Sequence, residues 1–82
     1  MARILYFASL VDQLGRGVEE VELPAEVTDV RGLLAWLRAR GGNWDKYIRE
    51  DALRITVNKK FAEPGTRVTD GDEIALVSAR LA

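Results

Sequence analysis

The order of apolar and polar residues predicts two strands in the first quarter of the chain. The continuous apolar and aromatic run at 3–8, RILYFA, is typical of a central strand with both faces at least partly covered. Apolar and acidic residues alternate at 18–23, which predicts a second strand that ends before Pro24 and runs antiparallel to the first. The stretch between them, 9–17, is expected to be a loop with one helical turn at 10–14.

The strongest helical pattern follows at about 29–40. Four apolar residues at i, i+3, i+4 and i+7 form one stripe: Val30, Leu33, Leu34 and Leu37. Thr28 or Asp29 is suited to cap the start of this helix, and Gly41-Gly42 to end it in the left-handed conformation. We also expect a short second helix, capped by Asn43, which turns Trp44, Tyr47 and Ile48 inward.

The last third of the chain returns to strand patterns. Apolar residues alternate with polar ones at 53–57, and Asn58-Lys59 then indicates a hairpin turn. Asp70-Gly71-Asp72 indicates another turn, in which glycine would supply a positive φ and the Asp70 side chain would bind nearby backbone amides. A final strand is predicted at 73–77, and 78–82 form a short tail.

This order of elements predicts one α+β domain over residues 1–82 with a β-grasp, or ubiquitin-like, fold. The sheet would be mixed, with four to five strands, and one main helix would lie on one face. The first and last strands would be central neighbours. No repeat, linker or low-complexity segment interrupts the pattern.

Composition narrows the possible functions. The 82 residues have a net charge of −1 and no large local bias, which argues against a nucleic-acid or membrane-surface binder. The chain has no Cys and no His, so thiolate or imidazole metal sites and the usual nucleophiles and bases are absent. The acidic pairs fall at turns and strand ends, where solvated surface explains them better than catalysis. We therefore expect no metal ligands, no bound cofactor and no catalytic residues of the chain's own, and a cytoplasmic location.

The side of the sheet opposite the helix is a candidate binding surface. If the helix covers one face, then Phe7 and Val77 point to the other, and Phe61 follows the hairpin beside them. An exposed apolar patch of this kind commonly marks a partner surface. In the alternative interpretation, the loop at 9–17 folds over these side chains.

The run VNKKFAEPGTRVTDGDEIA near the carboxyl end resembles the small subunit of molybdopterin synthase, a ubiquitin-like sulfur carrier of molybdenum cofactor biosynthesis. This resemblance implies that the terminal carboxylate, here of Ala82 after Leu81, is transiently adenylated and then converted to a thiocarboxylate. It also implies two partners, the large subunit of the synthase and an E1-like adenylating enzyme. Apolar residues of the outer sheet face would contact them, and Ser78, Ala79 and Arg80 would enter their channels.

The family pattern differs from this chain at the tail and after the first strand. The tail reads SARLA where the family ends in Gly-Gly, and Val11 stands where the family often carries Arg. The alternative function is therefore a ubiquitin-like protein-interaction module that has kept the apolar face without the carrier chemistry.

Overall fold

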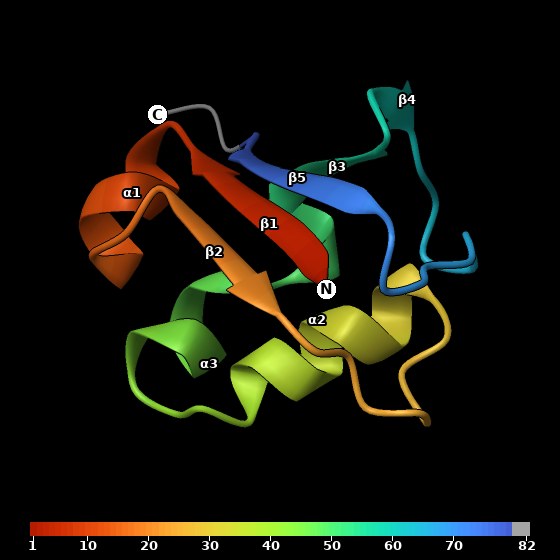
Figure 1. Ribbon diagram of the computed structural model, residues 1–82. Helices are drawn as coiled ribbons and strands as arrows, with labels where there is room; N and C mark the ends of the chain where they lie inside the picture. The colour runs from red at the N-terminus through yellow and green to blue at the C-terminus, as the bar shows by residue number, and fades with distance from the viewer. Residues whose placement is uncertain (80–82) are drawn as a thin grey trace.

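The chain folds into a five-stranded mixed sheet with two helices packed against one face. The computed structural model describes residues 1–79, and the strand order is β2-β1-β5-β3-β4 (Figure 1). β1 (Ala2–Phe7) pairs antiparallel with β2 (Val18–Val21) and parallel with β5 (Glu73–Ser78). β3 (Leu53–Val57) pairs antiparallel with β5 and with the two-residue β4 (Lys60–Phe61). The fold is the β-grasp that the sequence predicts, with the first and last strands as central neighbours.

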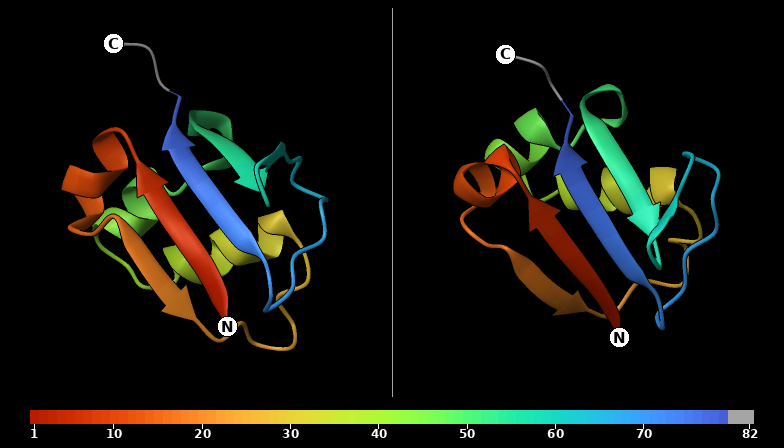
Figure 2. Two further views of the ribbon diagram at one scale, coloured as in Figure 1. Left: turned by 45° about the horizontal axis from the view of Figure 1, so that its top comes forward. Right: turned by 90° about the horizontal axis from the view of Figure 1, so that it is seen from above.

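Alternation along the two central strands places one set of side chains inside. On β1 and β5, Ile4, Tyr6, Ile74 and Leu76 are all buried, while their neighbours along each strand are exposed or half-buried. Because successive side chains of a strand point to opposite faces, one face forms the core and the other remains open. Figure 2 shows the helices behind the sheet and the open face in front.

Helix α2 (Val30–Arg38) covers the inner face. Its predicted stripe is fully buried, and the side chain of Asp29 caps the helix by accepting a hydrogen bond of 2.7 Å from the Gly32 amide. The amide groups of Val30 and Arg31 donate to carbonyl groups at 64–66, so this loop closes the amino end of the helix. The left-handed backbone at Gly41 follows the last turn, as predicted.

Helix α3 (Asn43–Tyr47) forms where the short helix was predicted, but its cap differs. The cap residue is Gly42, and the Asn43 side chain instead donates to the Gln13 carbonyl oxygen at 2.8 Å. Asn43 therefore ties α3 to α1 (Ser9–Leu14), the helix that occupies most of the predicted loop. Ile48 is buried, and Trp44 packs edge-on against Tyr6 with ring centroids 5.5 Å apart.

Two turns support β5, and one of them differs from expectation. The β3–β4 hairpin turns at Asn58 and Lys59, both with positive φ, as a tight hairpin requires. The turn before β5 lacks a positive φ at Gly71 and is held by Asp72, which accepts hydrogen bonds from the amide and hydroxyl of Thr69. Asp70, the first residue of this turn, was expected to bind nearby amides. Its side chain instead accepts a hydrogen bond of 2.9 Å from the distant Leu23 amide.

A short 3-10 helix, η1 (Glu50–Ala52), leads into β3 and was not predicted. The other notable backbone feature is Ala8, between β1 and α1, with φ 60° and ψ −136°. A residue with a Cβ rarely adopts this backbone conformation, whereas glycine adopts it readily. Ala8 is thus a strained joint beside the end of β5.

Candidate functional site: the open sheet face and the root of the tail

A row of mainly apolar side chains crosses all five strands on the open face. Leu5 of β1 lies opposite Val18 of β2 and Ala75 of β5. Thr56 of β3 lies between Ala75 and Phe61 of β4. The register of the sheet therefore joins Phe61 to the centre of the face rather than leaving it isolated at the edge.

A second row lies nearer the end of β5. Phe7 is paired with Val77, which in turn is paired with Arg54 of β3. We call the two rows without Arg54 the outer-face patch, which comprises Leu5, Phe7, Val18, Thr56, Phe61, Ala75 and Val77. Arg54 is exposed and borders the patch on β3. Phe7 is 45% exposed and Phe61 82% exposed, so residues 9–17 do not bury them. The alternative in which that segment covers the patch is wrong.

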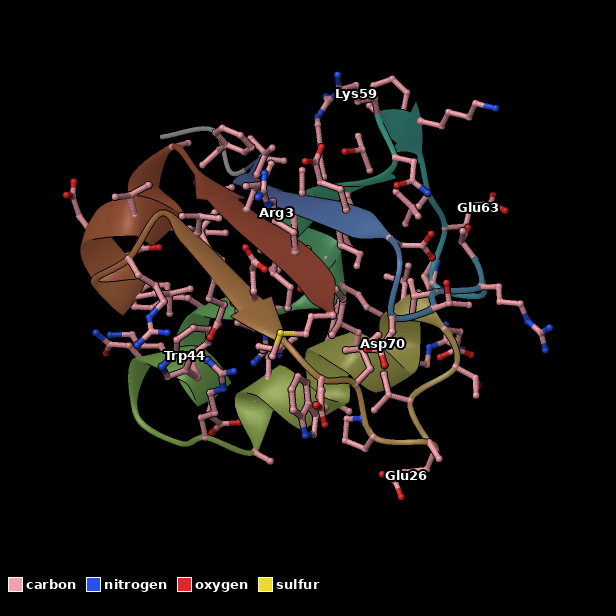
Figure 3. The ribbon with its side chains drawn as sticks, in the orientation of Figure 1. Arg3, Glu26, Trp44, Lys59, Glu63 and Asp70 are labelled. Atoms are coloured by element: carbon pink, nitrogen blue, oxygen red, sulfur yellow. The ribbon has the colours of Figure 1, made fainter. Side chains whose placement is uncertain are left out.

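Charged side chains border the outer-face patch at the opposite end from Phe7. Arg3 forms an ion pair of 3.5 Å with Glu20 and is paired across the sheet with Glu73. Figure 3 shows Arg3 on the side of the sheet away from α2. An apolar centre with a polar border is the usual composition of a protein–protein interface.

The end of β5 forms the root of the tail. The Ser78 hydroxyl accepts a hydrogen bond of 3.0 Å from the Ser9 amide and lies 2.8 Å from the Ser9 hydroxyl. The Ala79 amide donates to the Ala52 carbonyl oxygen at 3.0 Å. Ser78 and Ala79 are thus fixed between α1 and η1, while Arg80, Leu81 and Ala82 lie outside the described residues.

A polar cluster beneath β2 accounts for one of the acidic pairs. Glu19 accepts a hydrogen bond of 2.6 Å from the Tyr6 hydroxyl and forms ion pairs with Arg16 and Arg40. The Arg40 guanidinium also lies 4.4 Å from the Trp44 ring centroid. Burial alone would raise the pKa of Glu19, but hydrogen bonds from Arg40 and Tyr6 outweigh it and lower that pKa. The cluster stabilises the contact of β1 and β2 with α3 and leaves no free base.

Two other charged groups noted in the sequence, Asp72 and Lys59, lie at turns. The side chain of Asp72 accepts a hydrogen bond from Asn58, and this bond together with those from Thr69 lowers the pKa of Asp72. Lys59 lies exposed at the hairpin turn, as its label in Figure 3 shows. Within residues 1–79, no group of three or more acidic side chains is placed to hold a metal ion, and no helix could span a membrane.

These features define the class of protein: a ubiquitin-like domain with an open apolar face and a tail leaving its central strand. The chain belongs to the ThiS family, whose model matches residues 4–80, and so to the ubiquitin-fold sulfur carriers. No curated protein matches it.

Three solved structures illustrate the similarity. A Pyrococcus furiosus protein provisionally identified as molybdopterin converting factor, subunit 1, is 27% identical, with a TM-score of 0.76 and 94% of each chain covered. SAMP1 from Haloferax volcanii is 21% identical, with a TM-score of 0.76, covering 99% of this chain and 97% of that one. The Haloferax volcanii HVO 2177 protein is 16% identical, with a TM-score of 0.79, covering 99% and 84%. The last two likenesses concern the fold alone.

Sequence reasoning missed two sets of residues near the site. Val18 and Thr56 belong to the outer-face patch, and only the pairing of β2 and β3 with their neighbours reveals this. Ser9 contacts Ser78 from 69 positions away. The parallel strands β1 and β5 end at the same edge of the sheet, so a residue just after β1 lies near a residue at the end of β5. This position after the first strand was the one signal in the sequence that could have indicated Ser9.

Proposed function

We propose that this chain is a sulfur carrier of the molybdopterin synthase small-subunit type. The observation that carries the proposal is the position of Ser78 and Ala79, which lead out of the central strand directly beside Phe7 and Val77 of the outer-face patch. A partner docked on that patch would lie next to the emerging tail. Membership of the ThiS family and the similarity to the Pyrococcus furiosus protein support it.

The proposed chemistry occurs at the carboxyl end, Ala82 in this sequence. A carboxylate oxygen attacks the α-phosphorus of ATP and displaces pyrophosphate, which leaves the terminus as an acyl-adenylate. A sulfide-level donor then attacks the acyl carbon, and AMP leaves with the oxygen, which yields a thiocarboxylate. The adenylating enzyme supplies the catalysis, and the carrier supplies the terminus. The synthase large subunit is the proposed partner that catalyses transfer of the sulfur from the thiocarboxylate to the substrate of the synthase.

Intact-mass spectrometry tests this chemistry. The chain is purified from its host and incubated with the host's adenylating enzyme, ATP and a sulfur donor. Replacement of one oxygen by sulfur adds about 16 Da, and we expect this gain at the carboxyl end. An unchanged mass, while the same enzyme modifies a carrier ending in Gly-Gly, would refute the proposal. The spectrum also defines the natural terminus.

Charge substitution in the outer-face patch tests the docking step. Phe7→Asp and Phe61→Asp place a carboxylate on the proposed interface, and we expect a loss of binding of at least about tenfold to the adenylating enzyme, since charges are depleted at interface centres. Ala35→Asp, on the exposed side of α2, is the matched control and should bind normally. Equal binding by all three variants would place the interface elsewhere.

The second candidate is a ubiquitin-like interaction or modifier protein without sulfur transfer. The fold similarity to SAMP1, described as a small archaeal modifier protein in a second structure, keeps this candidate open. Leu81 and Ala82 each carry a Cβ, which would hinder entry of the tail into a partner channel shaped for the bare backbone of Gly-Gly. Binding at the outer-face patch without any thiocarboxylate would favour this function.

A further inference from the structure

A cavity of about 290 Å³ lies beside the root of the tail and is not part of the outer-face patch. It lies between α1, α3 and the adjoining ends of β3 and β5. Ser9 and Ser78 line one part of it, and Leu10 and Leu53 another. Figure 2 shows these elements together at the end of the sheet where β5 finishes. We call this cavity the tail-root pocket.

The tail-root pocket has a positive lining in a chain of net charge −1. Lys46 and Arg49 contribute to the lining, and none of the described residues that line the cavity is acidic. Among residues 1–79, Lys46 forms no ion pair. Arg49 forms one, at 3.7 Å, with Asp51, and both of these side chains are mostly exposed. Such a long surface pair is weak, so Arg49 keeps donors for another anion.

The shape and chemistry of the cavity select a small amphipathic anion. Its volume is at the lower end of the range for small-molecule sites, which run from about 300 Å³ upward. The half-buried Leu53 offers contact to methylene groups, and the Ser9 hydroxyl can donate a hydrogen bond. A carboxylate on a short aliphatic stem satisfies all three features at once.

We propose that the tail-root pocket receives an acidic side chain of the adenylating enzyme that acts on the tail. This inference rests on the proposed function. The enzyme must reach beyond Ser78 to act on the carboxyl end, so part of its surface has to cover this end of the domain. The pocket adjoins the outer-face patch, because Phe7 and Val77 immediately precede the Ala8-Ser9 segment and Ser78 in the chain. Contact with the patch and the pocket would fix the direction in which the tail enters the enzyme.

Charge reversal tests the proposal. Lys46→Glu and Arg49→Glu each place a carboxylate at the pocket, whereas Lys59→Glu makes the same charge change at the far hairpin turn. All three side chains are exposed, so the variants are expected to fold, which thermal unfolding checks. Affinity for the host's adenylating enzyme is measured by calorimetry at about 50 mM and 300 mM salt, since exposed charges are screened at high ionic strength.

The proposal expects a loss of about tenfold or more for Lys46→Glu and Arg49→Glu at low salt, and a smaller loss at high salt. Lys59→Glu should bind within about twofold of wild type. If the two pocket variants bind normally while Phe7→Asp does not, the pocket proposal is overturned and the proposed function stands. If wild type itself neither binds nor is modified, the proposed function fails and the occupant named here fails with it.

Discussion

Replacing Ala8 with glycine is expected to stabilise the protein, although glycine usually destabilises. Ala8 has φ 60° and ψ −136°, a backbone region that costs a residue with a Cβ about 1–3 kcal/mol. The methyl group is exposed, so its removal sacrifices little packing. Against this gain, glycine gives the unfolded chain more conformational freedom, which lowers the free energy of unfolding by about 0.4–1 kcal/mol. The net expectation is a stabilisation of about 1 kcal/mol.

Two matched variants separate backbone strain from other effects. Gly42 has nearly the same conformation, φ 57° and ψ −131°, and a Cβ placed there would meet no atom within 4 Å. Gly42→Ala should therefore destabilise the chain by about 1 kcal/mol through the backbone alone. Ala35→Gly, in the exposed middle of α2, should also destabilise by about 1 kcal/mol, since glycine is a poor helix former.

Thermal and urea unfolding measure all three variants. For a domain of this size, 1 kcal/mol corresponds to a shift in Tm of about 4–8 °C. Ala8→Gly should raise Tm, and the other two should lower it. A Tm for Ala8→Gly that falls as far as that of Ala35→Gly would refute the reasoning, because it would show that Ala8 is not strained.

Three further predictions follow from packing, turn chemistry and charge. Leu34→Ala should destabilise by about 2–5 kcal/mol, since the buried side chain leaves a cavity, and calorimetry should show a greatly lowered Tm. Lys59→Gly should stabilise the protein by up to about 1 kcal/mol, because φ is 71° at this position and Asn-Gly suits this hairpin turn. Urea unfolding measures the effect, and Lys60→Gly, in the neighbouring strand β4, is the control that should not stabilise. The hydrogen bond from Asn58 lowers the pKa of Asp72 in the folded state. The contribution of Asp72 to stability is therefore fully present above its unfolded pKa and is lost as the pH falls through its folded pKa. Asp72→Asn should make the acid side of the stability–pH profile shallower, and an unchanged profile would contradict this.

The parts of the fold that depend on local periodicity could be predicted from the sequence. The helical stripe from Val30 to Leu37 and the alternation at 53–57 each show which side of the element is buried, and the apolar run at 3–8 marks a central strand. The Asn58-Lys59 turn was also predictable, since it needs only a short-range signal. Together these features give the element order, and the element order gives the β-grasp.

The partners of polar side chains could not be predicted in the same way. Asp70 was expected to bind neighbouring amides, yet it accepts a hydrogen bond from Leu23, 47 positions away. Asn43 was expected to cap α3, yet it reaches Gln13 across a helix pair. Both side chains have competing local and distant partners of similar chemistry, and only the assembled fold decides between them. The tail-root pocket escaped prediction for the same reason, because its lining comes from four separate segments.

The central position of β5 links the emergence of the tail to the completion of folding. β5 is the last strand of the described chain, and it supplies the pairing partner for both β1 and β3. During synthesis the β1–β2 hairpin can form early, but the sheet cannot join its two halves until residues 73–78 arrive. Contacts between β1 and β5 span almost the whole chain, so closing this loop is entropically costly and should be a slow step.

It follows that a partly folded chain has no ordered tail root. Ser78 finds Ser9 only when β5 lies beside β1, and Ala79 finds Ala52 only when β3 has docked on the other side. A partner that needs the tail to leave the domain in one direction would therefore reject incompletely folded chains. For such a partner, the strand order alone would link binding to complete folding, because the root of the tail is ordered only when β5 has paired with both β1 and β3.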